Sequence, residues 1–228
     1  MSTKKSAIPA KIIRSRRKSI ALVIQPDGEL IVRAPKRATR KQINSLIEKH
    51  ADWIAKKQIQ AKETQALFAP HQFLEGESFP FLGKNYPLEF VDSEKPKLVF
   101  LNRFQLAKSA EKEAKVVFEQ WYKKQAREIF ASRVEHYSQK NGFSYQNVKL
   151  SSAKKRWGSC SAKGNLNLTW RLVMMPIEII DYVIVHELCH LRELNHSKRF
   201  WANVEEIFPD YKIRRKWLKE NGNKFHFP

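Results

Sequence analysis

The most constraining stretch of the chain is an apolar run that ends in two histidines four residues apart. Residues 177–185 read IEIIDYVIV and lead directly into HELCH at 186–190. On a helix, side chains at i and i+4 lie on one face about one turn apart, so His186 and His190 can reach the same metal ion. The run is apolar enough for a buried helix, with Pro176 at its first position. Two histidines on one face of a buried helix predict a metal site.

Glu187 and His196 complete the expected site. Glu187 follows the first histidine, so it projects about 100° round the helix, toward the side where a reacting water would lie. His196 comes six residues after His190, and three neutral nitrogen ligands plus water give the tetrahedral coordination of a catalytic zinc ion. We therefore expect Zn²⁺ held by His186, His190 and His196, with Glu187 as the general base. The alternative is a packed helix whose polar residues satisfy one another.

The third ligand has rivals. Glu193 would share the face of the two histidines if the helix continued unbroken. His196 is favoured because Asn195 can end the helix in the left-handed conformation and Ser197 can cap the next helix, which would turn His196 back toward the metal. The alternatives that stay open are Glu193, Glu205 and Glu206.

Composition indicates a folded and strongly basic protein. Of 228 residues, 42% are hydrophobic and 11% aromatic, which is enough to fill a core. The 43 Lys and Arg against 23 Asp and Glu give a net charge of +20, which attracts polyanions, so nucleic acid has to be considered as a partner. The alternative is a solvated basic surface. The basic residues singled out are Arg14, Arg16, Arg17, Lys18, Lys36, Arg37, Arg40, Lys41, Lys154, Lys155, Arg156, Arg214, Arg215 and Lys216.

The absence of targeting signals favours a cytoplasmic location. The N-terminal stretch has no apolar run long enough for a signal peptide, and no later segment approaches the length of a transmembrane helix. With Cys160 and Cys189 as the only cysteines, no disulfide framework is expected. Cys189 points off the histidine face and is expected to be a small core residue.

The first half of the chain is expected to be rich in strands. Residues 1–10 are interpreted as a disordered basic tail. Two β-rich runs flank Pro26-Asp27-Gly28, which predicts a hairpin. From residue 73 to 106, short strands broken by turn residues indicate an antiparallel meander.

Two long helices are expected outside the histidine motif. The first runs from about Arg40 into the 60s after a capping box of Thr39 and Gln42. Its buried residues are expected to be Ile43, Leu46, Ile47, Trp53 and Ile54. The second opens after Ser109 and stops at Asn141-Gly142. Its apolar side is expected to contain Val116, Val117, Trp121, Ile129, Phe130 and Val134.

Strands near 148–152 and 166–172 are expected to form an antiparallel pair that leads into the histidine helix. The second of these strands can bind an extended peptide by edge pairing. An oxyanion formed on a peptide carbonyl needs a donor or a positive charge. The candidates, each of which can instead be structural, are Arg156, Tyr211 and His226.

Several segments resemble the YgjP-like metallopeptidase family, a relative of the WLM and SprT-like zinc proteases. They are RWGSCS at 156–161, NLNL at 165–168, VHELCH at 185–190 and NHSKRFW at 195–201. The early RSRRKSIALVIQPDGELIVRAPK and the closing PDYKIRRKWLKENG are similar too, so the resemblance covers nearly the whole chain. It implies a zincin-like core, a metal held by His186, His190 and His196, and Glu187 as catalytic acid and base.

The combined prediction is a single α+β zincin-like domain over residues 11–228. A β-rich portion with one helix, 11–108, precedes a helical catalytic portion, 109–228. The expected activity is zinc-dependent hydrolysis of protein or peptide substrates, in which Glu187 takes a proton from water and delivers it to the leaving amine. Two alternatives stay open: a basic nucleic-acid-binding protein with a structural zinc site completed by Cys160, and a DNA-associated protease, which the SprT-like resemblance suggests.

Overall fold

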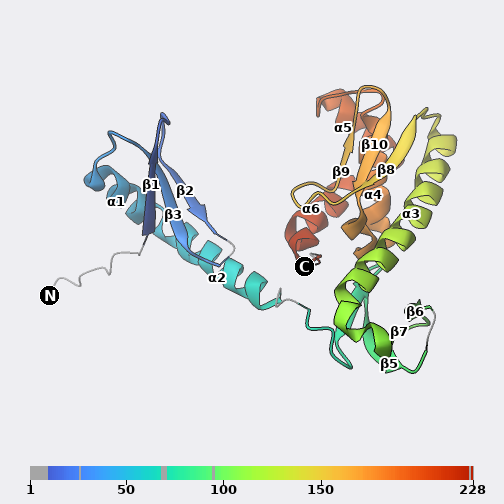
Figure 1. Cartoon of the computed structure of the whole chain (residues 1–228). Helices are drawn as coiled ribbons and strands as arrows, with labels where there is room; N and C mark the ends of the chain where they lie inside the picture. The colour runs from blue at the N-terminus through green and yellow to red at the C-terminus, as the bar shows by residue number, and fades with distance from the viewer. Residues whose placement is uncertain (1–9, 26, 68–70, 94–95, 226, 228) are drawn as a thin grey trace. The chain divides into compact units, whose positions relative to one another are not determined.

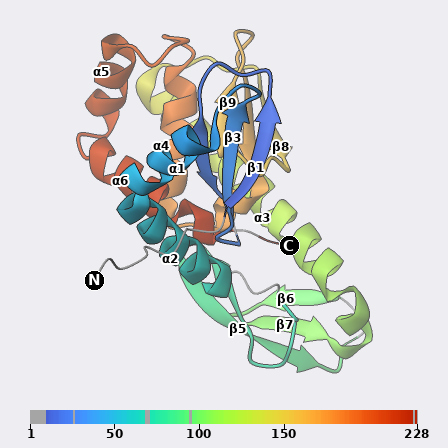
Figure 2. The same cartoon turned by 90° about the vertical axis from the view of Figure 1, so that its left-hand side faces the viewer.

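The computed structural model describes residues 10–25, 27–67, 71–93, 96–225 and 227. The chain forms two units, Met1–Ala69 and Pro70–Pro228 (Figures 1 and 2). The expectation of one domain over residues 11–228 stays a prediction. Pro26 and the expected tail up to residue 9 lie outside the described residues, whereas residue 10 already belongs to a strand.

A three-stranded sheet forms the first layer of the N-terminal unit. Its strands are β1 (Ala10–Ser15), β2 (Ala21–Ile24) and β3 (Leu30–Pro35), in the order β1-β3-β2. Strands β2 and β3 pair antiparallel, so the predicted hairpin is confirmed, with Gly28 in the left-handed region at a φ of 85°. Strand β1 pairs parallel with β3. It was not predicted, because its sequence AKIIRS shows no alternation of apolar and polar residues.

Two helices cover one face of this sheet: α1 (Arg40–Lys49) and α2 (Ala51–Leu67). The capping box is confirmed, since the Thr39 hydroxyl accepts from the Gln42 N–H while the Gln42 side chain accepts from the Thr39 N–H. The single predicted helix is divided at His50. Its Trp53 side chain is 43% exposed, so that burial prediction was wrong. The core of the unit contains Leu30, Val32, Ala34, Ile43, Ile47 and Ile54.

A small sheet opens the second unit. Its strands are β4 (Ser78–Phe81), β5 (Lys84–Val91), β6 (Leu98–Phe100) and β7 (Phe104–Ala107), in the order β4-β5-β7-β6. The predicted meander is wrong in one pairing, because β7 inserts beside β5 and the two run parallel. Phe79 and Phe104 of this sheet pack on Phe118, with ring centroids 4.3 and 5.0 Å away. The sheet therefore shares its core with the later helices.

The long helix α3 (Ala114–Asn141) follows a 3₁₀ turn, η1 (Lys108–Glu113). Its predicted end is confirmed, because Gly142 adopts the left-handed conformation at a φ of 64°. Val116 is 53% exposed, so it does not belong to the apolar side. The buried stripe contains the predicted Val117, Phe130 and Val134, together with Phe118, Tyr122 and Ala126. As Figure 1 shows, the small sheet lies at one end of α3, while the histidine helix and its neighbours lie along the rest.

A second three-stranded sheet precedes the histidine helix. Its strands are β8 (Asn147–Ser151), β9 (Gly158–Cys160) and β10 (Asn165–Thr169), in the order β8-β10-β9. Strands β8 and β10 run parallel, so the predicted antiparallel pair is wrong; the antiparallel partner of β10 is β9. Since β10 is central, it has no free edge for a peptide. Within the described residues the edge strands of this sheet are β8 and β9. Strand β9 has three residues and is too short to show periodicity.

The remaining elements form the helical end of the chain. They are η2 (Trp170–Met174), α4 (Ile177–Cys189), α5 (Lys198–Ile207), α6 (Tyr211–Asn221) and η3 (Gly222–Lys224). The start of α4 is anchored by the turn between β4 and β5, where the Leu82 and Gly83 N–H groups donate to carbonyls of η2 at 3.0 Å each. The α+β class is confirmed. No helix among the described residues combines the length and apolarity needed to cross a membrane.

An ion pair fixes α4 against α3. The Arg133 guanidinium donates to both carboxylate oxygens of Asp181, at 2.6 and 2.5 Å, and the Tyr137 hydroxyl donates to the same carboxylate at 3.1 Å. Asp181 lies in the buried middle of α4. The register of the helix that carries the first two histidines is thus held by a charged, bidentate contact.

Candidate metal centre

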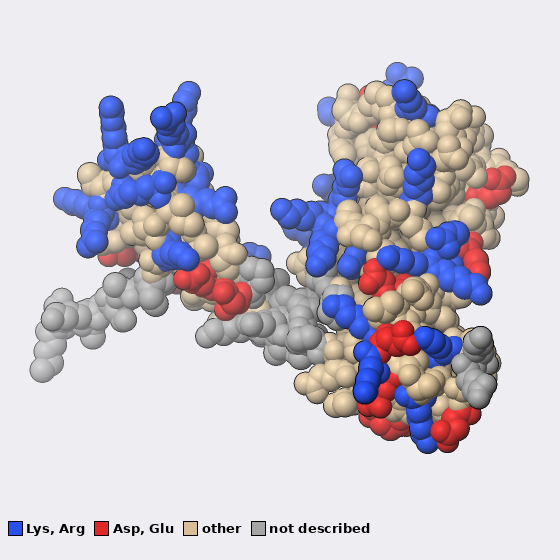
Figure 3. Space-filling model, in the orientation of Figure 1, with Lys and Arg blue, Asp and Glu red and all other residues tan. Residues whose placement is uncertain are grey.

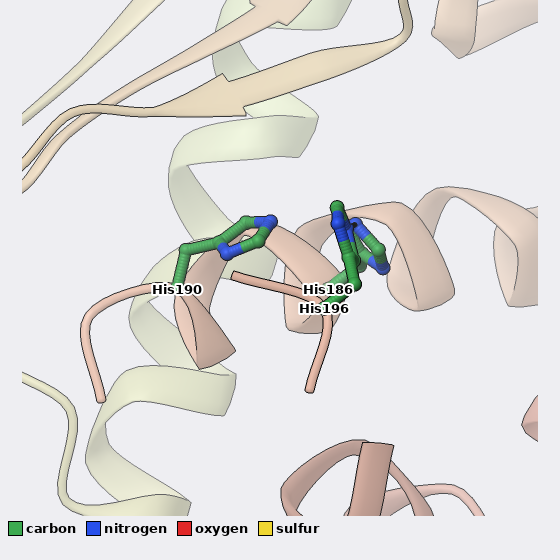
Figure 4. Close-up of side chains that lie close together, drawn as sticks. All are labelled: His186, His190 and His196. Atoms are coloured by element: carbon green, nitrogen blue, oxygen red, sulfur yellow. Dashed lines mark hydrogen bonds between the residues drawn. The ribbon is translucent and has the colours of Figure 1, made fainter. Parts of the chain in front are cut away.

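Three histidines converge at the end of α4. His186 lies in its last turn, His190 caps its C-terminus, and His196 lies in the turn before α5. One ring nitrogen from each lies within 4.8 Å of the others, and the Nε2 atoms of His186 and His196 are 2.9 Å apart. Figure 4 shows the three rings directed toward a common space. Such a set of imidazoles can bind one metal ion.

The chain turns back between His190 and His196 by local hydrogen bonds. The predicted cap at Ser197 is confirmed, since its hydroxyl accepts from the Phe200 N–H at 3.2 Å. The predicted left-handed conformation of Asn195 is wrong, because Asn195 does not have a positive φ. Its side-chain oxygen accepts from the Ser197 N–H at 2.9 Å instead. This short polar turn puts His196 beside His186.

Glu193 contributes its backbone rather than its carboxylate. Its carbonyl oxygen lies 3.0 Å from His190 Nδ1. Because a carbonyl can only accept, Nδ1 must carry the hydrogen, which leaves Nε2 of His190 with a free lone pair. Among the described residues, the converging group consists of the three histidines alone. The rival ligands are outside it: Glu193, Glu205, Glu206 and Cys160.

Burial favours the neutral, metal-binding form of two of the histidines, His186 and His196. Burial lowers the pKa of His186 to about 3, with help from the neighbouring His190 and His196. Burial also lowers the pKa of His196. His186 Nδ1 is buried and has no hydrogen-bond partner among the described residues. Three imidazole nitrogen donors in a partly desolvated place fit zinc.

Phe200 forms the apolar support of the histidines. Its ring centroid lies 4.9, 4.5 and 4.7 Å from those of His186, His190 and His196, and its side chain is fully buried. Trp201 stacks on His196 at 5.6 Å. No role was predicted for Phe200. The signal was its position three residues after the Ser197 cap, which directs it back over the preceding turn.

Glu187 is buried against strand β9. Its side chain, on a residue only 6% exposed, accepts a hydrogen bond from the Cys160 backbone N–H. A Cβ at Gly158 would lie 2.6 Å from both Cγ and Oε1 of Glu187, closer than real contacts allow. Glycine at 158 is therefore what admits the carboxylate.

Burial is the main cause of the shifted pKa values of Glu187 and Cys160. It raises the pKa of Glu187 to about 7, against the opposing effects of the Arg156 charge and the Cys160 N–H. Burial and the charge of Glu187 raise the pKa of the Cys160 thiol to about 11. Among the described residues Cys160 does not belong to the converging group, so the structural-zinc alternative has no support from it.

The oxyanion candidates have different surroundings. Arg156 is exposed and close enough for its charge to act on Glu187. Tyr211 is buried and stacks on Trp201 at 5.3 Å. His226 lies outside the described residues. Arg215 was predicted only as part of a basic run. It lies over the Trp201 ring at 4.5 Å, and its charge lowers the pKa values of His186 and His196.

A histidine cluster beside a buried glutamate, on an α+β scaffold, is typical of metallopeptidases that carry the H-E-x-x-H motif. Residues 18–221 match the family model described as YgjP-like, metallopeptidase domain, so the chain belongs to the YgjP-like metallopeptidase family. The search of curated proteins finds no match. Among solved structures, the crystal structure of the metallopeptidase zymogen of Pyrococcus abyssi abylysin is 28% identical, with a TM-score of 0.36 over 40% of this chain and 93% of that one.

Proposed function

We propose that this metallopeptidase is zinc-dependent, with His186, His190 and His196 as metal ligands and Glu187 as general base and acid. The observation that carries the proposal is the convergence of three imidazole nitrogens within 4.8 Å of one another. The residue after the first of these histidines is the buried Glu187. Bound zinc supplies a Lewis acid that polarises the scissile carbonyl and acidifies a water near neutral pH.

The surrounding residues hold the histidines for this task. The Glu193 carbonyl fixes the proton of His190 on Nδ1, so Nε2 remains available. Phe200 packs on all three rings, which limits their rotation and keeps water from that side. A set of ligands held this firmly loses little conformational entropy when it binds a metal.

Glu187 is positioned to move protons. The Cys160 N–H and the close approach of Gly158 restrict its carboxylate. In the proposed reaction the carboxylate takes a proton from the attacking water as the oxygen bonds to the carbonyl carbon. It then gives the proton to the leaving nitrogen as the C–N bond breaks.

The free edge of β9 supports an extended peptide substrate. Within the described residues β9 pairs on one side only, with β10, and it packs against α4. A peptide that adds a strand there gains backbone hydrogen bonds that do not depend on its side chains. The proposed substrates are thus proteins or peptides in extended conformation.

The test compares zinc-loaded wild type with Glu187→Gln on an unfolded protein such as casein and on a peptide library. Glu187→Gln should retain one zinc per chain but lose at least about 100-fold in turnover, because Gln cannot accept the proton. Glu178→Gln is the matched control, since Glu178 is an exposed glutamate of the same helix. It should cleave like wild type. Equal cleavage by Glu187→Gln would overturn the proposed mechanism.

The metal ligands are tested separately. His190→Ala and His196→Ala should each lose stoichiometric zinc, whereas Glu193→Ala should keep it, because Glu193 acts through its backbone carbonyl. Zinc is measured by elemental analysis after dialysis. Zinc loss in Glu193→Ala alone would show that the carboxylate is the third ligand.

A further inference from the structure

The positive charge of the protein is concentrated in its N-terminal unit. Residues 1–69 hold 16 Lys or Arg against 5 Asp or Glu, a net charge of +11, whereas the remaining 159 residues carry the other +9. In Figure 3 the blue side chains stand out from this unit over a largely uncharged surface with few acidic groups. The charge density therefore distinguishes the unit from the peptidase portion.

Two basic segments meet at one end of its sheet. The end of β1 is paired with the end of β3, with Ser15 opposite Pro35. The Arg14 guanidinium also donates to three carbonyls after β3, those of Pro35, Lys36 and Ala38, at 3.2, 2.9 and 2.7 Å. These contacts bring residues 16–18 close to residues 36–41. We name this surface the basic end; it comprises Arg16, Arg17, Lys18, Lys36, Arg37, Arg40 and Lys41.

The basic end has no internal neutralisation. Among the described residues, none of its seven side chains forms an ion pair with a carboxylate. The sequence has no acidic residue between Glu29 and Glu48. Arg40 and Lys41 lie in the first turn of α1, which has no acidic residue and where the helix dipole is already positive. Arg17 Nε is buried without a hydrogen-bond partner. This arrangement repels itself unless an anion lies against it.

We propose that the basic end binds the phosphodiester backbone of nucleic acid. Closely spaced cations need closely spaced anions, and a duplex presents one phosphate per about 1.7 Å of its axis. Four of the seven residues are arginines, whose planar guanidinium groups suit phosphate oxygens. Contacts to phosphate carry no base sequence, so binding is sequence-independent. The peptidase would thereby be held on nucleic acid through its N-terminal unit, whereas the metal-binding histidines belong to the second unit.

Fluorescence anisotropy of the full-length protein with a labelled 20-base-pair DNA duplex, and with RNA of the same length, tests the proposal. Between about 50 and 200 mM salt, log Kd should change linearly with log salt concentration, with a slope of about 0.9 per neutralised phosphate. The test variant replaces Arg16, Lys36, Arg37 and Lys41 by Gln. All four are exposed, and Arg14, which holds backbone carbonyls, is kept. Its slope should fall by about 3 to 4, and its affinity at least tenfold.

The matched control removes four exposed charges from α3, by Lys115→Gln, Lys124→Gln, Arg127→Gln and Lys140→Gln. It has the same net charge as the test variant and should bind nearly like wild type. Circular dichroism melting checks that both fold; if the test variant does not, the pair Lys36→Gln and Arg37→Gln replaces it.

Three results would overturn the proposal: no binding at 50 mM salt, equal loss in both variants, or competition by polyglutamate as strong as by DNA at equal charge. The last would identify an acidic protein as the partner. Tighter binding of DNA than of RNA, or the reverse, identifies the nucleic acid. Because binding is measured without metal or peptide, its failure would leave the proposed peptidase function untouched.

Discussion

The buried carboxylate of Glu187 should destabilise the metal-free protein at alkaline pH, and Glu187→Gln should remove that cost. Burial raises the pKa of Glu187 from 4.5 to about 7. Each pKa unit corresponds to about 1.36 kcal/mol, so ionised Glu187 costs about 3 kcal/mol of the free energy of unfolding. Gln has the same shape, can accept from the Cys160 N–H and carries no charge.

The direction in which stability changes with pH follows from proton linkage. Because the pKa is higher in the folded state, the unfolded chain loses this proton first as the pH rises. The stabilisation of the protonated carboxyl is complete below pH 4.5 and is lost as the pH rises through about 7. Glu187→Gln should therefore match wild type near pH 4.5 and be more stable by about 3 kcal/mol above pH 8.

Urea unfolding of chelator-treated protein from pH 4.5 to 8.5, followed by circular dichroism, measures the difference. The titration of His186 occurs in both proteins and cancels. Glu178→Gln should change the stability by less than about 0.5 kcal/mol at every pH, as exposed substitutions do. A difference between Glu187→Gln and wild type that is absent at pH 8, or that does not vary with pH, would refute the burial of Glu187 against β9.

Three further substitutions probe the supports of the site. Gly158→Ala should retain zinc but lower turnover at least tenfold, because the new Cβ would lie 2.6 Å from the Glu187 carboxylate. Gly222→Ala, whose Cβ would meet the Trp157 ring at 3.2 Å and Leu218 at 3.5 Å but not Glu187, should be nearly silent. Phe200→Ala should cost about 3 to 5 kcal/mol in urea unfolding and weaken zinc binding in a chelator competition. Asp181→Ala should cost about 3 kcal/mol, because it leaves Arg133 without its carboxylate; unchanged stability in either case would contradict the packing described.

The histidine site could be predicted from the sequence because most of its geometry is local. His186 and His190 are one helical turn apart, so their relation depends on backbone geometry alone. The Ser197 cap, which fixes the return of His196, is likewise a contact over three residues. The reason given for Asn195 was wrong because a side-chain hydrogen bond to the Ser197 N–H ends the turn without a positive φ.

The contacts that the sequence did not reveal join segments far apart in the chain. Strand β9 has three residues and no alternation, so only its pairing with β10 defines it. The parallel pairs of β1 with β3 and of β5 with β7 depend equally on partners elsewhere in the chain. Arg215 reaches the site from α6, and nothing in its local sequence specifies that approach.

Strand β9 links the acid-base group to the proposed peptide-binding edge. Gly158 admits the Glu187 carboxylate, and the Cys160 N–H donates a hydrogen bond to it, although Cys160 and Glu187 lie far apart in the sequence. In the proposed function the substrate pairs with the free edge of β9, which is the edge toward which the Cys160 N–H points. Since a three-residue strand moves as one piece, a peptide that shifts β9 also shifts the carboxylate that must receive the proton. Peptide binding and proton transfer are then coupled, so a substrate that pairs poorly with β9 should lose turnover as well as affinity.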